Sequence, residues 1–176
     1  EQREHLADLD ISALKTAEFL HETLRLAAGE RAVIRTGVVL SPEALALRRL
    51  ALPYRLYVGG PLGSGRQWFS WIHEEDLAAI FLYLMERTDL EGPFNCTAPG
   101  PVRNAEFTRA LAAALGVAAF LPAVPGFLMR LVMGEFGEVI LQGQKVMPGR
   151  LLKEGFRFRF PDLPSALSDL LQKTGT

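Results

Sequence analysis

A run of apolar, mostly β-branched residues extends from Ala32 to Leu40 and ends at Ser41-Pro42. The run is nearly continuous, whereas a strand with one wet face would alternate apolar and polar residues. It therefore predicts a strand that is covered on both faces, as in a parallel sheet. Parallel strands need long crossover connections, and helical patterns stand on both sides of this run. The expected fold class is α/β.

Apolar residues recur at helical spacing in several other segments. The predicted helices cover residues 10–28, 43–52, 74–87, 105–115 and 163–173. The acidic run Glu74-Glu75-Asp76 suits the positive end of the third helix, and Asn104 suits the N-cap of the fourth.

Short strands are expected over residues 67–72 and 94–97, and the alternating run Phe156–Phe160 predicts a strand with one wet face. Gly and Pro residues divide the last sixty residues into short pieces. We therefore expect an α/β part over residues 1–118 and a small, mainly helical substrate or cap domain over residues 119–176.

Composition excludes several classes of protein. The 176 residues are 49% hydrophobic, and 19 basic and 20 acidic residues are interspersed, so we expect no nucleic-acid partner. The apolar runs are shorter than the roughly 20 residues that span a bilayer, so we expect no membrane segment. The three histidines have no metal-binding spacing, and no metal is expected. The single cysteine, Cys96, suits a cytoplasmic protein and a buried packing role.

A glycine-rich loop over residues 59–71 is the first candidate for a binding site. Gly60 to Gly65 have the spacing of a phosphate loop, but Arg66-Gln67 stand where Lys and Ser/Thr are required, which favours a plain loop. The chain also has no Gly-x-Gly-x-x-Gly turn to place a dinucleotide pyrophosphate at a helix N-terminus. We therefore expect a longer protein that carries this turn upstream.

Three segments in order, 11–18, 34–40 and 63–76, resemble the second half of an extended short-chain dehydrogenase/reductase of the nucleotide-sugar epimerase type. Residues 59–73 and 95–104 are similar to an atypical epimerase-like branch that ends in a small C-terminal domain. The resemblance implies the second half of a doubly wound Rossmann-type fold. It also implies an epimerase/dehydratase-like oxidoreductase that uses NADP or NAD on a small-molecule substrate, and it leaves room for a homodimer.

The family's reactive pair is a Tyr placed four residues before a Lys on one helix. Lys15 matches the lysine, so the resemblance implies that Lys15 holds the cofactor ribose and assists catalysis. Ile11 stands at the tyrosine position, and an alkyl group donates no proton. Two alternatives therefore stay open, a catalytically silent NADP(H)-binding sensor and a protein-interaction module. Tyr83 is expected only to pack.

The resemblance also implies two groups of ligand-contacting residues. The strand end beside the nicotinamide would be Arg35, Thr36, Gly37 and Val38; alternatively, Gly37 only ends a strand and Arg35 pairs with a neighbour. The substrate residues would be Arg66, Gln67, Trp68 and Trp71, although both tryptophans equally suit a core role. Phe69-Ser70 replace the family's phosphate-gripping Arg-Asp pair. His73 and Asp76 are expected to cap and orient the helix that follows them.

Overall fold

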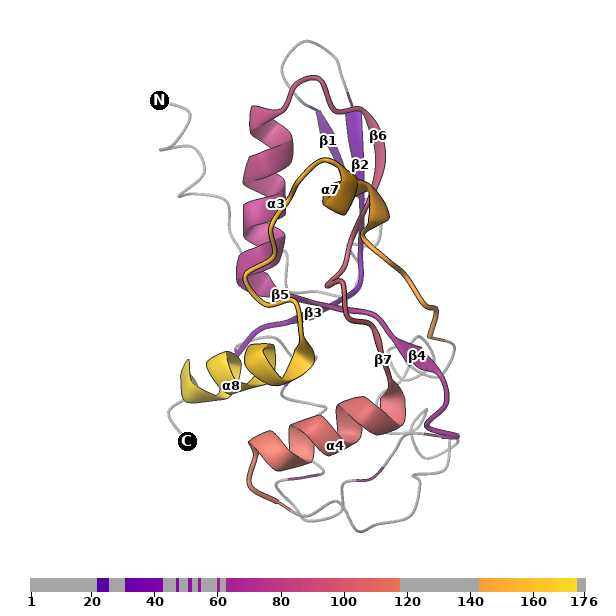
Figure 1. Cartoon of the computed structure of the whole chain (residues 1–176), viewed down its shortest axis with the longest axis vertical. Coiled ribbons are helices and arrows are strands. Elements are labelled where there is room, and N and C mark those ends of the chain that lie inside the picture. The colour runs from indigo at the N-terminus through magenta and orange to yellow at the C-terminus, as the bar shows by residue number, and fades with distance from the viewer. Residues whose placement is uncertain are drawn as a thin grey trace.

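Figure 1 shows the computed structural model of the protein, in which a helix lies along a three-stranded sheet. Helix α3 (Glu74–Glu86) lies along a sheet formed by β1 (Glu22–Arg25), β2 (Arg31–Thr36) and β6 (Gly92–Cys96), and α4 (Asn104–Ala114) and α8 (Leu163–Lys173) lie below it. The residues that the structure describes are 22–25, 31–42, 47, 51, 54, 60, 63–117 and 143–173.

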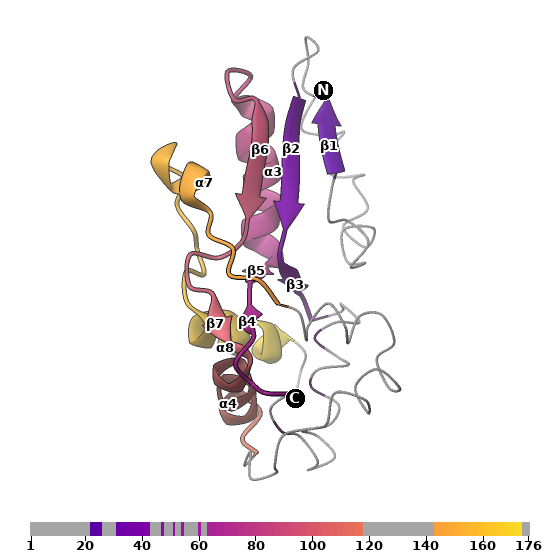
Figure 2. The same cartoon turned by 90° about the vertical axis from the view of Figure 1, so that its right-hand side faces the viewer.

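The sheet has β2 between its two neighbours, as Figure 2 shows. β2 pairs with β6 in parallel, with Ile34 opposite Phe94, and with β1 antiparallel. β3 (Val38–Leu40) pairs in parallel with β5 (Trp71–His73), and β4 (Trp68–Phe69) pairs antiparallel with β7 (Val102–Arg103). The parallel pairs agree with the pairing that the apolar run predicted, whereas the antiparallel β1 makes the three-stranded sheet mixed.

The predicted single strand over residues 32–40 is divided in two at Gly37. The chain changes its partner there: the N–H of Gly37 donates to the Cys96 carbonyl at 3.4 Å, and the N–H of Val38 donates to the Ser70 carbonyl at 2.9 Å. The prediction that both faces are covered was wrong for β2. In the part of the chain that the structure describes, Ile34 on one face is buried, whereas Arg35 on the other face is exposed. A continuous apolar run does not reveal such a change of neighbour.

The predicted helix over residues 10–28 was wrong at residues 22–25. These four residues form β1, whose backbone groups pair with the edge of β2 that would otherwise be open. The helical spacing of apolar residues does not reveal that a distant strand edge is available for pairing. The rest of the predicted helix lies outside the described residues.

Two of the predicted helices are confirmed by residues that bury one face. α3 buries Leu77, Ile80, Phe81 and Leu84, and α8 spans the predicted range and packs against α4. α4 starts one residue earlier than predicted, with Arg103 rather than Asn104 at the N-cap. Of the predicted helix over residues 43–52, Leu47 and Ala51 are described, and both are helical and buried.

The predicted strand over residues 156–160 was also wrong. Its side chains do alternate, with Phe156 and Phe160 buried and Arg157 exposed. The backbone N–H groups of Arg159 and Phe160, however, donate to the two carboxylate oxygens of Asp76, at 2.7 and 2.9 Å, rather than to a strand. A buried carboxylate on α3 therefore takes the place of a neighbouring strand.

Two buried clusters hold the described residues together. One includes Trp71, Phe107 and Leu167, and the other includes Ile34, Phe94 and Leu151 of the short helix α7 (Gly149–Lys153). Each cluster joins residues from before and after position 118. The boundary expected at residues 118–119 borders the undescribed segment and stays a prediction. None of the helices that can be followed is long and apolar enough to cross a bilayer.

Candidate functional site

The candidate site lies at the carboxyl ends of β2 and β6. The two strands are parallel, and their last paired residues are Thr36 and Cys96. In open α/β sheets, ligands bind in the crevice outside the carboxyl ends of the strands. Thr36, Gly37 and Val38, three of the predicted cofactor residues, occupy this edge. The fourth, Arg35, lies one residue before it with an exposed side chain.

Gly37 is required at this edge by a close backbone approach. A Cβ atom added to Gly37 would lie 2.6 Å from the carbonyl oxygen of Ser70 and 3.1 Å from Cγ2 of Thr97. Contacts under 3.0 Å with backbone atoms cannot be relieved by a small side-chain movement. Of the two interpretations of Gly37, a close approach and a simple strand end, the structure therefore favours close approach, here to Ser70.

A segment from the C-terminal part of the chain crosses the same edge. We call residues 143–148 the strap; in Figure 1 it is the orange trace that leads to α7. The Ser70 hydroxyl donates to the Gln144 carbonyl at 2.7 Å and accepts from the Val146 N–H at 3.0 Å. The Thr97 hydroxyl donates to the Val146 carbonyl at 3.3 Å. Side chains of the carboxyl edge thus hold the strap through its backbone.

The β4–β7 pair brings positive charge to the same region. Trp68 is half-buried opposite Arg103, whose guanidinium carbon lies 3.7 Å from the Trp68 ring centroid. The Lys145 ammonium of the strap lies 4.7 Å from the same centroid. Sequence reasoning missed Ser70, Arg103 and Lys145 as site residues, because three separate segments contribute them. The one available signal was that Ser70 falls within the Phe69-Ser70 pair that departs from the family pattern.

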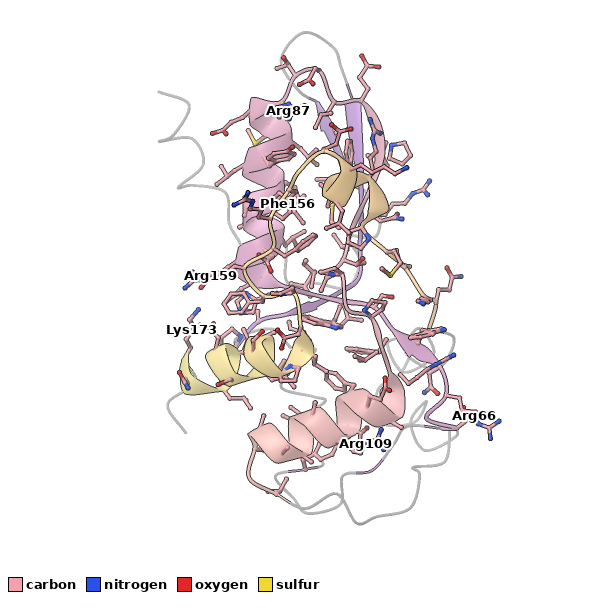
Figure 3. The ribbon with its side chains drawn as sticks, in the orientation of Figure 1. Arg66, Arg87, Arg109, Phe156, Arg159 and Lys173 are labelled. Carbon is pink, nitrogen blue, oxygen red and sulfur yellow. The ribbon has the colours of Figure 1, made fainter. Side chains whose placement is uncertain are left out.

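The four predicted substrate residues are not gathered into one pocket. Trp71 is wholly buried and its indole N–H donates to the Gly100 carbonyl at 3.0 Å, so it takes the core role and its ring is not available to a ligand. The Gln67 side chain accepts from the Ser64 hydroxyl at 3.3 Å. Arg66 is exposed and projects away from the body of the molecule (Figure 3). Trp68 is the member that faces other site residues.

The glycine loop caps a helix. The carbonyl of Gly65 accepts from the Ala105 N–H at 3.0 Å, and the carbonyl of Gln67 accepts from the Asn104 N–H at 2.9 Å. These N–H groups belong to the first turn of α4 and have no partner within the helix. Gly63 and Gly65 have φ angles of 56° and 69°, which favour glycine. Carbonyls that point at a helix N-terminus satisfy the donors a phosphate would use, which supports the plain-loop interpretation.

His73 caps α3, as the sequence predicted. Its Nδ1 accepts from the Glu75 N–H at 3.1 Å, so the ring proton lies on Nε2, which faces the Asp169 carboxylate at 3.2 Å. The ring also stacks on Phe160, with 3.8 Å between ring centroids. Burial lowers the pKa of His73, and this effect outweighs the opposing effect of Asp169. The lowered pKa favours the neutral ring of His73 at pH 7, and the ring links α3 to α8.

Asp76 does not share the predicted capping role, because its carboxylate holds the backbone of residues 159 and 160. The neighbouring Glu75 carboxylate forms ion pairs with Arg159 and Lys173, each at 2.5 Å. Lys173 also forms an ion pair with Asp169 at 2.6 Å. Figure 3 shows Arg159 and Lys173 on the same side of the molecule. The start of α3 is thus the docking point of the C-terminal segment.

The stability of the fold should decrease on acidification, and His73 should account for part of the decrease. Its folded-state pKa lies below the ordinary value of 6.5, so the unfolded chain binds more protons just below that pH. We expect the free energy of unfolding to fall from about pH 6.5 to about pH 5. In His73→Asn, which retains a capping acceptor, this slope should be shallower.

Urea unfolding at several pH values measures this slope. The other two histidines are common to both proteins and cancel in the comparison. The Glu75 and Asp169 carboxylates have pKa values lowered from 4.5 and 3.8, so their losses belong to more acidic solutions. Equal slopes for the two proteins between pH 6.5 and 5 would contradict the neutral, buried His73.

Cys96 and Tyr83 have packing roles, as expected. Cys96 is wholly buried, and burial raises the pKa of its thiol to about 12. The Tyr83 hydroxyl donates to the Glu154 carbonyl at 2.6 Å and accepts from Arg87 at 3.1 Å. Neither group is available for proton transfer at the carboxyl edge. Lys15 and Ile11 lie outside the described residues.

Parallel strands, a crossover helix and a glycine at the carboxyl edge define the latter half of a Rossmann-type fold. The chain is 48% identical over 140 residues to the mouse epimerase family protein SDR39U1, covering 79% of this chain and 47% of that protein. A crystal structure of human SDR39U1 with NADPH matches with a TM-score of 0.74 and 41% identity, over 81% of this chain and 48% of that chain.

A nucleoside-diphosphate sugar epimerase from Corynebacterium glutamicum matches with a TM-score of 0.59 and 34% identity, over 80% of this chain and 26% of that chain. Residues 124–170 match a family described as a domain of unknown function, DUF1731. The chain belongs to the epimerase-like branch of the extended short-chain dehydrogenase/reductases. It spans about half the length of the curated relatives that it matches. The resemblance and the fold class expected from the sequence are thereby confirmed.

Proposed function

We propose that the protein binds NADP(H) or NAD(H) at the carboxyl edge of β2 and acts as an epimerase/dehydratase-like oxidoreductase on a small-molecule substrate. The observation that carries the proposal is the packing of Gly37 against Ser70 at this edge. The crystal structure of human SDR39U1 with NADPH supports the choice of cofactor.

A homodimer is part of the same proposal. Light scattering, which measures the molar mass in solution, tests it.

The backbone at Gly37 suits a ligand that needs a fixed position. The N–H groups of Gly37 and Val38 are engaged by Cys96 and Ser70, and packing leaves no room for a side chain. A preformed edge loses little conformational entropy when a ligand is bound, which favours affinity. When bound, the nicotinamide would supply the hydride chemistry, and this edge would orient it.

The source of a proton separates the proposed enzyme from a second candidate, a silent NADP(H)-binding sensor. Ile11 at the family's tyrosine position favours the sensor. The hydroxyls of Ser70 and Thr97, which lie at the edge, both hold the strap. An enzyme would therefore need a proton carrier from the substrate, from water or from a part of the protein beyond the described residues.

Titration with NADPH and NADH, followed by tryptophan fluorescence, tests binding. We expect saturable binding of at least one of the two cofactors by the full-length protein. Absorbance at the nicotinamide band, across a panel of carbonyl and sugar substrates, then tests turnover. Binding with turnover supports the enzyme, and binding without turnover supports the sensor. If neither cofactor binds, both candidate functions are wrong.

Lys15→Ala should weaken NADPH binding by about tenfold, because it removes a charge-assisted hydrogen bond to the ribose that the resemblance implies. The matched control is Lys153→Ala, which removes the same charge from an exposed position on α7 and should leave the affinity unchanged.

Tyr83→Phe should leave both binding and activity unchanged. Lost activity in Tyr83→Phe would show that the family's reactive helix has been matched to the wrong segment.

A further inference from the structure

We propose that Trp68, Arg103 and Lys145 form a binding site for an oxyanion, the phosphoryl or carboxylate group of a small-molecule ligand. We call these three residues the Trp68 cluster. The assignment of this anion to the protein's substrate rests on the proposed function, whereas anion binding itself does not.

The two cations of the cluster share one aromatic ring. They lie 3.7 and 4.7 Å from one ring centroid. Neither has a carboxylate within ion-pair distance among the residues that the structure describes. The nearby Glu106 carboxylate accepts from the backbone N–H of Arg103 at 2.7 Å. Two positive charges that contact one aromatic ring raise the local potential and favour a bound anion.

The fold holds the Arg103 guanidinium in place and fixes the backbone that carries Lys145. The Arg103 guanidinium stacks on Trp68 and donates one N–H to the carbonyl of Arg66. Stacking fixes the guanidinium plane and leaves its other N–H groups at the edge, in the fork that suits two oxygens of a phosphate or carboxylate. The backbone on either side of Lys145 is fixed because Ser70 binds both of its neighbours in the strap, Gln144 and Val146, and the exposed Lys145 side chain reaches the Trp68 ring.

The cluster lies on the ligand side of the strand. Phe69 is buried in the core, so by the alternation of an extended chain Trp68 and Ser70 point to the opposite side, where both contact the strap. Trp68 precedes Ser70 by two residues, roughly 7 Å of extended chain. An anion bound to the Trp68 cluster would thus lie close enough to Gly37 for one small molecule to reach both. The cluster supplies positive charge that the neighbouring Phe69-Ser70 pair lacks.

Isothermal titration of the full-length protein without cofactor tests the site, using inorganic pyrophosphate and succinate as probes. We expect saturable binding of at least one probe, and the preferred probe identifies the oxyanion. Arg103→Gln and Lys145→Gln should each weaken that binding about tenfold, as expected for loss of a charge-assisted contact. The matched control is Arg109→Gln, which removes one charge from an exposed position on α4 (Figure 3) and should change the affinity less than about twofold.

Thermal unfolding of each variant checks that the fold is retained, and Lys145→Gln leaves the Arg103 stacking intact. Absence of saturable binding of both probes would overturn the proposal. So would an equal loss in Arg109→Gln, because general surface charge would then explain the affinity. Cofactor titration separates the two proposals, since loss of NADPH binding with retained anion binding would contradict only the proposed function.

Discussion

Gly37→Ala is expected to destabilise the protein by about 3 kcal/mol and to abolish cofactor binding. The new methyl group would lie 2.6 Å from a backbone oxygen of Ser70, so β3 and the Ser70 segment must separate. That separation breaks the hydrogen bond from Val38 to Ser70 and loosens the edge proposed to hold the nicotinamide. Urea unfolding measures the first effect, and NADPH titration measures the second.

Gly149→Ala provides the control for the same chemical change. A Cβ at Gly149 meets no atom within 4 Å, so this variant should be neutral or slightly more stable. Equal stability of the two variants would mean that Gly37 only ends a strand. The close approach would then carry no functional meaning.

Asp76→Ala is expected to cost about 4 kcal/mol of stability. The Asp76 carboxylate is 2% exposed and accepts the backbone N–H groups of Arg159 and Phe160. Its removal leaves one buried and one partly buried N–H group without their acceptor. Urea unfolding measures the loss, and hydrogen exchange should show that the segment around residues 159 and 160 opens before the rest of the fold.

Glu74→Ala controls for charge at the same helix end. Glu74 precedes Asp76 by two residues in the first turn of α3, and its side chain is partly exposed. Its replacement should cost well under about 1 kcal/mol, the scale of a charge–dipole effect. If both variants lose the same stability, the carboxylate of Asp76 acts through the helix dipole and does not anchor the C-terminal segment.

Local patterns in the sequence were sufficient for the helices that bury one face. The stripe from Leu77 to Leu84 fixes both the existence and the buried side of α3, and the same holds for α8. These predictions succeeded because helical hydrogen bonds are local and the apolar stripe alone selects the face. The parallel pairing of β2 with β6 agrees with the apolar run, but the antiparallel pairing with β1 was not predicted.

Pairing between distant segments could not be predicted in the same way. The alternation in residues 156–160 gives the two faces correctly, but the acceptor for its N–H groups is a carboxylate more than 80 residues earlier in the chain. The break at Gly37 depends likewise on where Ser70 and Cys96 lie. Residues 22–25 became a strand because the edge of β2 was open to them.

The residues of the candidate site were likewise predictable only in part. Thr36, Gly37 and Val38 were proposed through resemblance, because a family motif records a backbone position, and they lie at the carboxyl edge. Arg103 and Lys145 escaped notice, since each is an ordinary surface cation until the fold brings it to Trp68. For Trp71, of the two roles left open by the sequence, burial favours the core role.

Hydrogen exchange of the full-length protein with and without NADPH tests the central claim, that the carboxyl edge of β2 receives the cofactor. We expect NADPH to slow exchange in the peptides that contain residues 34–40 and 69–73, which meet at Gly37 and Ser70. Bound NADPH that leaves exchange in these peptides unchanged would contradict the account.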